Sequence, residues 1–141
     1  MQVREGKGWR LEHDPDRCPF AVLIGGGELE GAWATELTSA EARALRRAVG
    51  RLLEQHRALV PSLLEEEAIS LELEVPCAEG ALWLGLQGDR QRWSLRFVLS
   101  PGPAGRAVEG GWDGAASAAL AAALAGLALE PLALDPRADS R

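Results

Sequence analysis

Hydrophobic and polar residues alternate along much of the chain, and this alternation predicts strands. In residues 92–100, RWSLRFVLS, apolar residues occupy every second position and mostly polar residues lie between them. A period of two is typical of a strand with one buried face. Similar runs at 8–13, 20–25, 33–37, 68–75, 81–87 and 106–112 bring the expected number of strands to about seven.

A helical period replaces this alternation after the third predicted strand. Thr38 and Glu41 form the pattern T-S-A-E, which is typical of a capping box, and apolar residues follow at helical spacing. We expect the first helix to begin near Ser39. It should end before Pro61 or in the turn after it, because an interior proline removes a backbone donor and clashes with the preceding turn.

A second helix is expected from about Gly114 to Leu129, with Asp113 as its cap. This segment is rich in alanine and is apolar on nearly every side. A helix of that kind must be covered on more than one side. We therefore expect it to pack against the first helix or against a second subunit.

The two halves of the chain share one apolar spacing. Leucine or valine stands 7, 11 and 14 positions after Thr38, and leucine stands at the same offsets after Asp113. We infer a duplicated unit, a meander of strands followed by a helix. The predicted fold is a single α+β domain over 1–130, in which helices cover antiparallel sheet, with a flexible C-terminal tail over 131–141.

Composition and charge narrow the classes of function. The chain has 141 residues, enough for one self-sufficient core, and a formal net charge of -6 with a pI near 5.0. This acidic balance disfavours non-specific binding to nucleic acid or to an anionic membrane. Apolar runs are too short to cross a bilayer, so we expect a cytoplasmic protein without membrane contact.

Residues that could carry catalysis or hold a cofactor do not form a recognisable pattern. Cys18 and Cys77 lie far apart and lack the partners of a zinc site or a disulfide framework. His56 falls on the apolar stripe of the first helix, as a core or interface histidine would. His13 and Asp14 start a turn without four metal ligands. The glycine-rich run 25–31 indicates a hairpin rather than a phosphate loop. We expect no enzyme and no cofactor.

A tryptophan and an arginine mark a candidate binding surface on one predicted hairpin. If residues 81–100 turn at 88–91, Leu86 faces Trp93, Gln87 faces Arg92, and Trp83 lies beside Arg96 on the outer face. An aromatic and guanidinium platform can stack bases, at about 1 to 3 kcal/mol per base.

The same geometry permits a purely structural interpretation. The strand 68–75 turns Glu72 and Glu74 to the same outer face, so that a row of Glu74, Trp83 and Arg96 would form an ion pair with a cation–π contact. Carboxylates in that row would repel phosphate. We favour this pairing over a ligand surface because the whole chain is acidic.

The first helix adds a second group of candidate binding residues. Opposite its apolar stripe it carries four arginines that could meet phosphates or an acidic partner: Arg43, Arg46, Arg47 and Arg51. A solvated helix face is the alternative, because Glu54 continues the row and can pair with a neighbouring arginine.

Short ordered motifs make the chain resemble a cyanobacterial family, the domain of unknown function 1818 family. The resemblance covers most of residues 6–130 and rests on these motifs: Gly8-Trp9-Arg10; Trp33-Ala34, Glu36-Leu37-Thr38 and Glu41; Ser94-Leu95-Arg96-Phe97; and Arg106 with Glu109-Gly110-Gly111-Trp112. It implies a fold similar to the single-stranded-DNA-binding transcriptional regulators, the Whirly proteins and positive-cofactor coactivators, which use a meander and helix twice. The chain departs from the nucleic-acid-binding members because its single lysine is Lys7.

Two functions follow as hypotheses. The first is a non-catalytic protein-interaction or regulatory module that binds a partner, or itself, through the outer sheet face or the alanine-rich helix. The alternative is a regulator-like module that binds single-stranded nucleic acid through Trp83, Arg92, Arg96 and the arginines of the first helix.

Overall fold

The computed structural model describes residues 1–27, 31–78, 80–102 and 105–129. Its first half is a four-stranded antiparallel sheet, called sheet 1, in the order β1-β2-β3-β4. The strands are β1 (Gln2–Gly6), β2 (Trp9–His13), β3 (Val22–Gly26) and β4 (Trp33–Leu37). Helix α1 (Ser39–Leu59) and the short 3-10 helix η2 (Val60–Ser62) follow.

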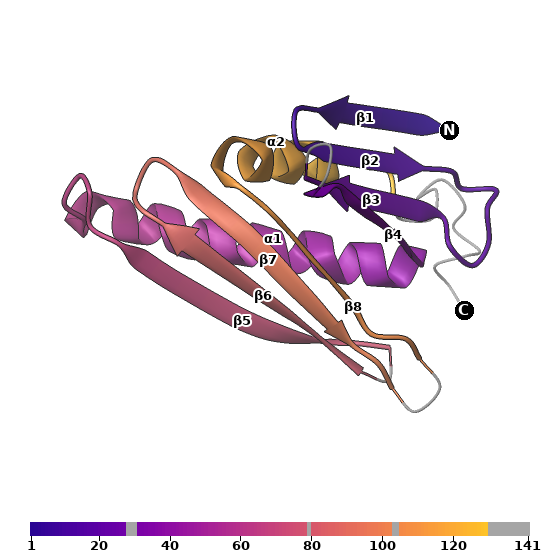
Figure 1. Ribbon diagram of the computed structural model, residues 1–141. Coiled ribbons are helices and arrows are strands. Elements are labelled where there is room, and N and C mark those ends of the chain that lie inside the picture. Colours follow the sequence, from indigo (N-terminus) through magenta and orange to yellow (C-terminus); the bar gives the residue numbers. More distant parts are fainter. Residues whose placement is uncertain (28–30, 79, 103–104, 130–141) are drawn as a thin grey trace, which may run out of the picture.

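The second half repeats this arrangement (Figure 1). Sheet 2 is a four-stranded antiparallel sheet in the order β5-β6-β7-β8, and helix α2 (Gly114–Ala125) follows it. The strands are β5 (Ile69–Cys77), β6 (Gly80–Gly88), β7 (Trp93–Ser100) and β8 (Val108–Trp112). The α+β class and the repeated strands-then-helix order agree with the sequence prediction.

The described chain has eight strands rather than about seven, because the sequence pattern did not reveal β1. All five residues of β1 are exposed, so no apolar residue needs to alternate with polar ones along it. It pairs with β2 from Gln2 opposite His13 to Gly6 opposite Trp9. Backbone hydrogen bonding, rather than burial of side chains, therefore defines this edge strand.

Helix α1 has the predicted N-terminus. The Glu41 N–H donates to Thr38 Oγ1 at 3.1 Å, and the Thr38 N–H donates to Glu41 Oε1 at 2.9 Å. This reciprocal capping box fixes the first turn at Ser39. The helix ends at Leu59, before Pro61, as predicted.

Helix α2 begins at Gly114, as predicted, but differs from the prediction in its capping and at its C-terminal end. Asp113 occupies the N-cap position but makes no side-chain capping bond. The helix ends at Ala125 instead of Leu129, and Gly126 donates to the carbonyls of its last turn. Ser117 anchors the first turns instead, because its hydroxyl donates to the Trp112 carbonyl at 2.7 Å and accepts from the Leu95 N–H at 2.9 Å.

The two helices fill the space between the sheets. Helix α1 packs along β5 and β6, whereas α2 contacts β7 and β2 and touches α1 (Figure 1). The alanine-rich helix is therefore covered within the chain, as one of the two predicted arrangements required. The residues of the shared apolar spacing are all buried: Leu45, Val49, Leu52, Leu120, Leu124 and Leu127.

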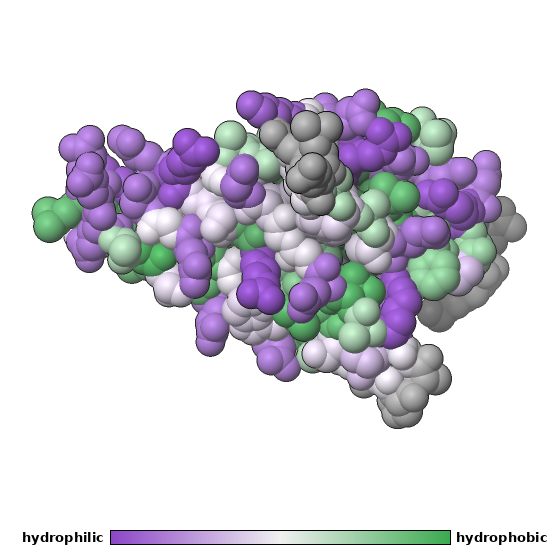
Figure 2. Space-filling view, in the orientation of Figure 1, coloured by the Kyte–Doolittle hydropathy of each residue, from purple (hydrophilic) through white to green (hydrophobic). Residues whose placement is uncertain are grey.

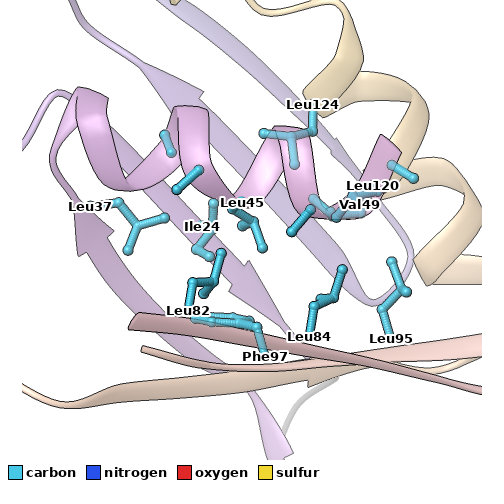
Figure 3. Packing of buried hydrophobic residues seen from close by; sticks show 14 of the residues in the cluster. Ile24, Leu37, Leu45, Val49, Leu82, Leu84, Leu95, Phe97, Leu120 and Leu124 are labelled. Atoms are coloured by element: carbon cyan, nitrogen blue, oxygen red, sulfur yellow. The ribbon is translucent and has the colours of Figure 1, made fainter. Parts of the chain in front are cut away.

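One hydrophobic core joins all these elements. Leucines of sheet 2 and Phe97 point toward α1, and Ile24 and Leu37 of sheet 1 reach the same cluster (Figure 3). Leu84 and Leu86 are fully buried, and their neighbours Leu95 and Phe97 are each 1% exposed. The prediction that leucines of the 81–100 hairpin face inward is confirmed.

Aromatic side chains join the two sheets at β8. The Trp112 indole N–H donates to the Gly25 carbonyl at 2.9 Å, and the Trp33 indole N–H donates to the Gly111 carbonyl at 3.2 Å. The two rings lie 5.4 Å apart, and Phe97 stacks on Trp112 at 5.7 Å. A Cβ at Gly110 would lie 2.3 Å from the Trp33 ring, so any larger residue there would overlap the ring unless the ring moved.

The register of the β6–β7 hairpin differs from the prediction by two residues. Leu86 faces Leu95 and Gln87 faces Ser94, instead of Trp93 and Arg92. The turn lies one residue later because the Asp89 carboxylate accepts from the N–H groups of Gln91 and Arg92, both at 2.8 Å. A shift of two residues keeps every side chain on its predicted face.

Four smaller predictions concern membrane-spanning helices, the two cysteines, His13 and the C-terminal tail. In the described part of the chain, no helix is both long enough and apolar enough to cross a membrane. Cys77 is buried and Cys18 is exposed, and both are free thiols. His13, expected in a solvated turn, is 6% exposed because it ends β2 on the inner face. The predicted tail, 131–141, lies outside the described residues.

Candidate interaction surface on the outer face of sheet 2

The side of sheet 2 that faces away from the helices is the candidate surface, here called the outer face. Strand alternation places polar, small and aromatic side chains on it, because the leucines occupy the inner positions. Figure 2 shows hydrophilic and hydrophobic residues intermixed over these strands. The outer face consists of Ser70, Glu72, Glu74, Pro76, Ala81, Trp83, Gly85, Gln87, Ser94, Arg96, Val98, Ser100, Glu109 and Gly111.

Trp83 is the largest side chain on the outer face. It lies directly opposite Glu74 of β5, and its indole N–H donates to Glu72 Oε2 at 3.3 Å. Its six-membered ring covers Gly85, where a Cβ would lie only 2.6 Å from Cη2. The missing side chain at Gly85 therefore lets a half-buried indole lie along β6 beside two carboxylates.

Arg96 lies on the outer face with Trp83, but its ion-pair partner is not the predicted Glu74. It lies opposite Gly85 and Gly111, and its Nη2 is 3.8 Å from Glu109 Oε2. Both side chains are about two-thirds exposed, so this pair contributes at most about 1 kcal/mol. The predicted ion pair between Arg96 and Glu74 is wrong, because Val98 occupies the position opposite Trp83.

Two adjoining hollows open on the outer face. One, of about 130 Å³, lies among Ser70, Glu72, Trp83, Gln87 and Arg96. The other, of about 450 Å³, lies at the β8 edge of sheet 2, where Glu109 and Gly111 of the outer face adjoin Trp112 of β8 and Trp33 of sheet 1. Because Ser94 and Arg96 line both, the two hollows adjoin at β7, and we call them together the depression.

The charge of the outer face is acidic. Glu72, Glu74 and Glu109 provide three carboxylates, and Arg96 is the cation among the fourteen residues named above. Among the described residues, the Glu74 carboxylate forms no ion pair, and the Glu72 carboxylate accepts a hydrogen bond only from the indole N–H of Trp83. The face therefore carries negative charge that the described chain leaves unpaired.

Arg92 does not join Trp83 and Arg96. It belongs to the hairpin turn after Asp89 rather than to β7, which begins at Trp93. Its side chain lies over Gly114, where a Cβ would be 2.3 Å from Arg92 Nε. This places the guanidinium at the beginning of α2.

The four arginines of α1 form a surface separate from the outer face, because α1 packs on the inner side of sheet 2. Arg43 donates to the Leu129 carbonyl at 3.1 Å, and Arg46 donates to the Leu127 carbonyl at 2.8 Å. These two residues hold the segment after α2 against α1. Arg47 and Arg51 are exposed.

His56 makes the contacts of a structural residue. His56 is 5% exposed, with Nε2 2.9 Å from the Asp89 carbonyl and its ring 6.0 Å from that of Trp93. It links α1 to the β6–β7 turn, in agreement with the expected core histidine. Among the described residues, no group of three histidine, cysteine or carboxylate side chains is placed to hold a metal ion.

The sequence did not reveal a polar cluster around Arg106. This residue precedes β8, donates to both Glu41 carboxylate oxygens and to the Glu36 carbonyl, and lies 4.6 Å from the centre of the Phe20 ring. Burial raises the pKa of Glu41, but hydrogen bonds from Arg106 and Thr38 outweigh burial and hold it below its ordinary value. The only available signal was the presence of both residues among the quoted family motifs.

A hollow of about 350 Å³ adjoins this cluster and includes Cys77. Burial, together with the charge of Glu41, raises the pKa of the Cys77 thiol above its ordinary value. The thiol is therefore protonated at neutral pH and is a poor nucleophile. These features fit a structural junction between sheet 1, α1 and β8.

Comparison with known proteins places the chain among proteins of unknown function. It is similar to a crystal structure of a protein with unknown function from Prochlorococcus sp. NATL2A, described as a member of the DUF155 family. The two are 33% identical, the match covers 88% of this chain and 96% of the other, and the TM-score is 0.74. No curated protein matches the chain. The family model for a domain of unknown function (DUF1818) matches residues 4–127, so the chain belongs to the DUF1818 family.

Proposed function

We propose that the chain is a non-catalytic protein-interaction or regulatory module that binds a protein partner through the outer face of sheet 2. The observation that carries this proposal is Trp83, which lies over Gly85 in a depression that the helices leave uncovered. Tryptophan is enriched in the small set of residues that dominate binding energy at protein interfaces.

The alanine-rich helix is the weaker docking site of the two considered. Its buried positions contact β2, β7 and α1, which leaves a narrow exposed stripe of small side chains: Ala115, Ala118, Ala122 and Ala125. Such a stripe offers little area to a partner. The outer face supplies an aromatic side chain, carboxylates and two adjoining hollows.

Site-specific crosslinking tests this proposal. A photoreactive amino acid is placed at Ser70, which is exposed and lines the hollow beside Trp83. The matched control carries the same group at Arg51, an exposed position of α1 on the other side of sheet 2. We expect a discrete protein adduct from position 70 that position 51 does not give.

The adduct should also depend on the aromatic ring. Adding Trp83→Ala to the position-70 variant should abolish it, whereas adding Arg47→Ala, an exposed change on α1, should not. Equal adducts from positions 70 and 51, or an adduct that survives Trp83→Ala, would contradict docking through this face.

Single-stranded nucleic acid binding is the second candidate, with a fold like that of the Whirly and coactivator regulators. The repeated unit of four strands and a helix and the placement of Trp83 near Arg96 on one face favour it. The carboxylates of Glu72 and Glu74 oppose it, because they form no ion pair with any described residue and would repel phosphate.

Salt dependence separates the two candidates. Nucleic acid binding weakens by nearly one log unit per phosphate contact for each log unit of salt. An oligonucleotide titration at low and high salt, repeated with Arg96→Ala, should show no saturable binding if the protein-interaction proposal is correct. Tight binding at low salt that Arg96→Ala removes would favour the nucleic acid function.

A further inference from the structure

The neighbours of Trp83 limit what a partner can place against it. The indole lies beside two glutamates of β5, because Glu74 is the direct cross-strand partner of Trp83 and Glu72 accepts its N–H at 3.3 Å. The ring covers the bare backbone at Gly85, so it is supported from below. An anionic or apolar side chain over this ring is disfavoured, because it would lie beside the two carboxylates.

Two independent effects favour a cation at the position over the Trp83 ring. The face of an indole attracts a guanidinium or ammonium group, and tryptophan does so more strongly than the other aromatic residues. The Glu74 carboxylate lies within the same cross-strand row and has no ion-pair partner among the described residues. A positively charged side chain would therefore contact both the indole face of Trp83 and the carboxylate of Glu74.

Arg96 also lines the hollow beside Trp83, but its ion-pair partner lies outside that hollow. Arg96 is drawn toward Glu109, 3.8 Å away and on the side of β7 opposite to β6. The hollow beside Trp83 is otherwise edged by uncharged Ser70, Gln87 and Ser94. The whole chain carries a formal charge of -6, which attracts a basic partner at long range.

We infer that the outer face of sheet 2 binds a basic polypeptide segment of its partner, with an arginine or lysine side chain over Trp83 and beside Glu72 and Glu74. This inference rests on the proposed function and specifies the chemistry of the partner. The hollow beside Trp83 adjoins at β7 the hollow at the β8 edge, which gives the rest of such a segment room to cross the sheet.

An NMR titration with short peptides tests the inference directly. The probe is a blocked Gly-Ser-Arg-Ser-Gly peptide, with lysine, citrulline and glutamate versions in place of arginine. The readout is the indole N–H signal of Trp83, assigned through Trp83→Phe among the five tryptophans of the chain. Trp93 serves as an internal control, because it lies on the inner face beside His56.

The expected result is a saturable shift of the Trp83 signal with the arginine and lysine peptides and no movement of Trp93. The citrulline peptide has nearly the same shape without charge and should bind at least about 3-fold more weakly. The variant Glu72→Gln with Glu74→Gln should weaken arginine peptide binding about 3- to 10-fold and make it less sensitive to salt.

Three outcomes would overturn the inference: no Trp83 shift at millimolar arginine peptide, equal binding of the citrulline or glutamate peptides, or unchanged binding to the double variant. Retention of the other amide signals shows that the double variant is folded. A single-stranded oligonucleotide that moves the Trp83 signal at lower concentration than the arginine peptide would also overturn it.

The two proposals fail in different ways. If the segment crosslinked from position 70 lacks basic residues, docking through the outer face stands and the basic partner is excluded. If the arginine peptide binds but position 70 gives no specific adduct, the cation site stands and the interaction function fails.

Discussion

Arg106 donates two hydrogen bonds to Glu41, from Nη1 to Oε2 at 3.1 Å and from Nη2 to Oε1 at 3.0 Å. Because Glu41 also completes the capping box with Thr38, one carboxylate holds both the beginning of α1 and the segment before β8. Arg106 reaches sheet 1 as well, through the Glu36 carbonyl and the Phe20 ring. The three parts of the fold therefore meet at this ion pair.

Glu41→Gln should destabilise the protein at neutral pH by about 1 to 3 kcal/mol, because it removes a charge-assisted pair that is largely shielded from water. The side chain of Glu41 is 14% exposed and that of Arg106 is 38% exposed, so the lower half of this range is expected. Chemical denaturation of the variant and the natural protein measures the difference.

The difference in stability between the natural protein and the Glu41→Gln variant should depend on pH. The pKa of Glu41 is lower in the folded protein than in the unfolded chain, so the unfolded chain binds more protons between the two values. The contribution of Glu41 is therefore complete above its unfolded pKa of about 4.3 and is lost as the pH falls through the folded value. The gap between natural protein and Glu41→Gln should narrow in acid; a gap that stays constant to pH 3 or widens would contradict this assignment.

Trp112→Phe should cost about 1 to 3 kcal/mol, because it leaves the Gly25 carbonyl without its indole donor in a buried site. Trp33→Phe is the matched comparison, since it removes a longer and only partly buried bond to the Gly111 carbonyl. We expect the Trp33 variant to lose less stability in urea denaturation. Equal losses would mean that ring packing rather than the hydrogen bonds joins the two sheets.

Most of the fold could be predicted from the sequence, because it follows from local patterns. Alternation identified the strands with one buried face, and the capping box identified the start of α1. Strand β1 lacked that signal since it is exposed on both faces. The register of the β6–β7 hairpin was missed because hydrogen bonds from the Asp89 carboxylate to the turn backbone move the turn by one residue.

The candidate site was predictable only in part. Alternation placed Trp83 and Arg96 on one face, but their partners depend on register, and a shift of two residues gave Arg96 the glutamate of β8 instead of that of β5. The cluster of Arg106 and Glu41 joins residues 65 positions apart, so no local pattern could reveal it. Arg43 and Arg46, which resemble a basic patch in the sequence, bind carbonyls after α2.

Ser117→Ala should destabilise the protein by about 2 kcal/mol or more despite the higher helix propensity of alanine. The Ser117 hydroxyl is fully buried and joins the Trp112 carbonyl to the Leu95 N–H, so alanine leaves two buried backbone groups unpaired. Ala118→Ser introduces a hydroxyl at the next, exposed position and should change stability by less than about 0.5 kcal/mol. A thermal shift of similar size in both variants would rule out this role.

Gly85 and Gly110 each lie under a tryptophan ring, and substitution by alanine should affect the two positions differently. At Gly85 an added Cβ would lie 2.6 Å from Cη2 of Trp83, and at Gly110 it would lie 2.3 Å from Cη2 of Trp33. The Trp33 ring cannot move aside without losing its bond to the Gly111 carbonyl and its contacts with Phe97 and Trp112. Gly110→Ala should therefore cost about 1 to 3 kcal/mol through overpacking.

Among the described residues, the Glu72 carboxylate gives Trp83 its one side-chain hydrogen bond, and the ring lines an open hollow. Its ring can swing away, and alanine is about 0.5 to 1 kcal/mol better than glycine within a strand, so Gly85→Ala should leave stability nearly unchanged. The variant should nevertheless bind the arginine peptide less well, because the displaced ring no longer lies beside Glu72 and Glu74. Urea denaturation and the indole N–H titration of both variants measure the two effects. A stable Gly85→Ala variant that binds the peptide normally would show that the position of Trp83 over Gly85 does not create the site.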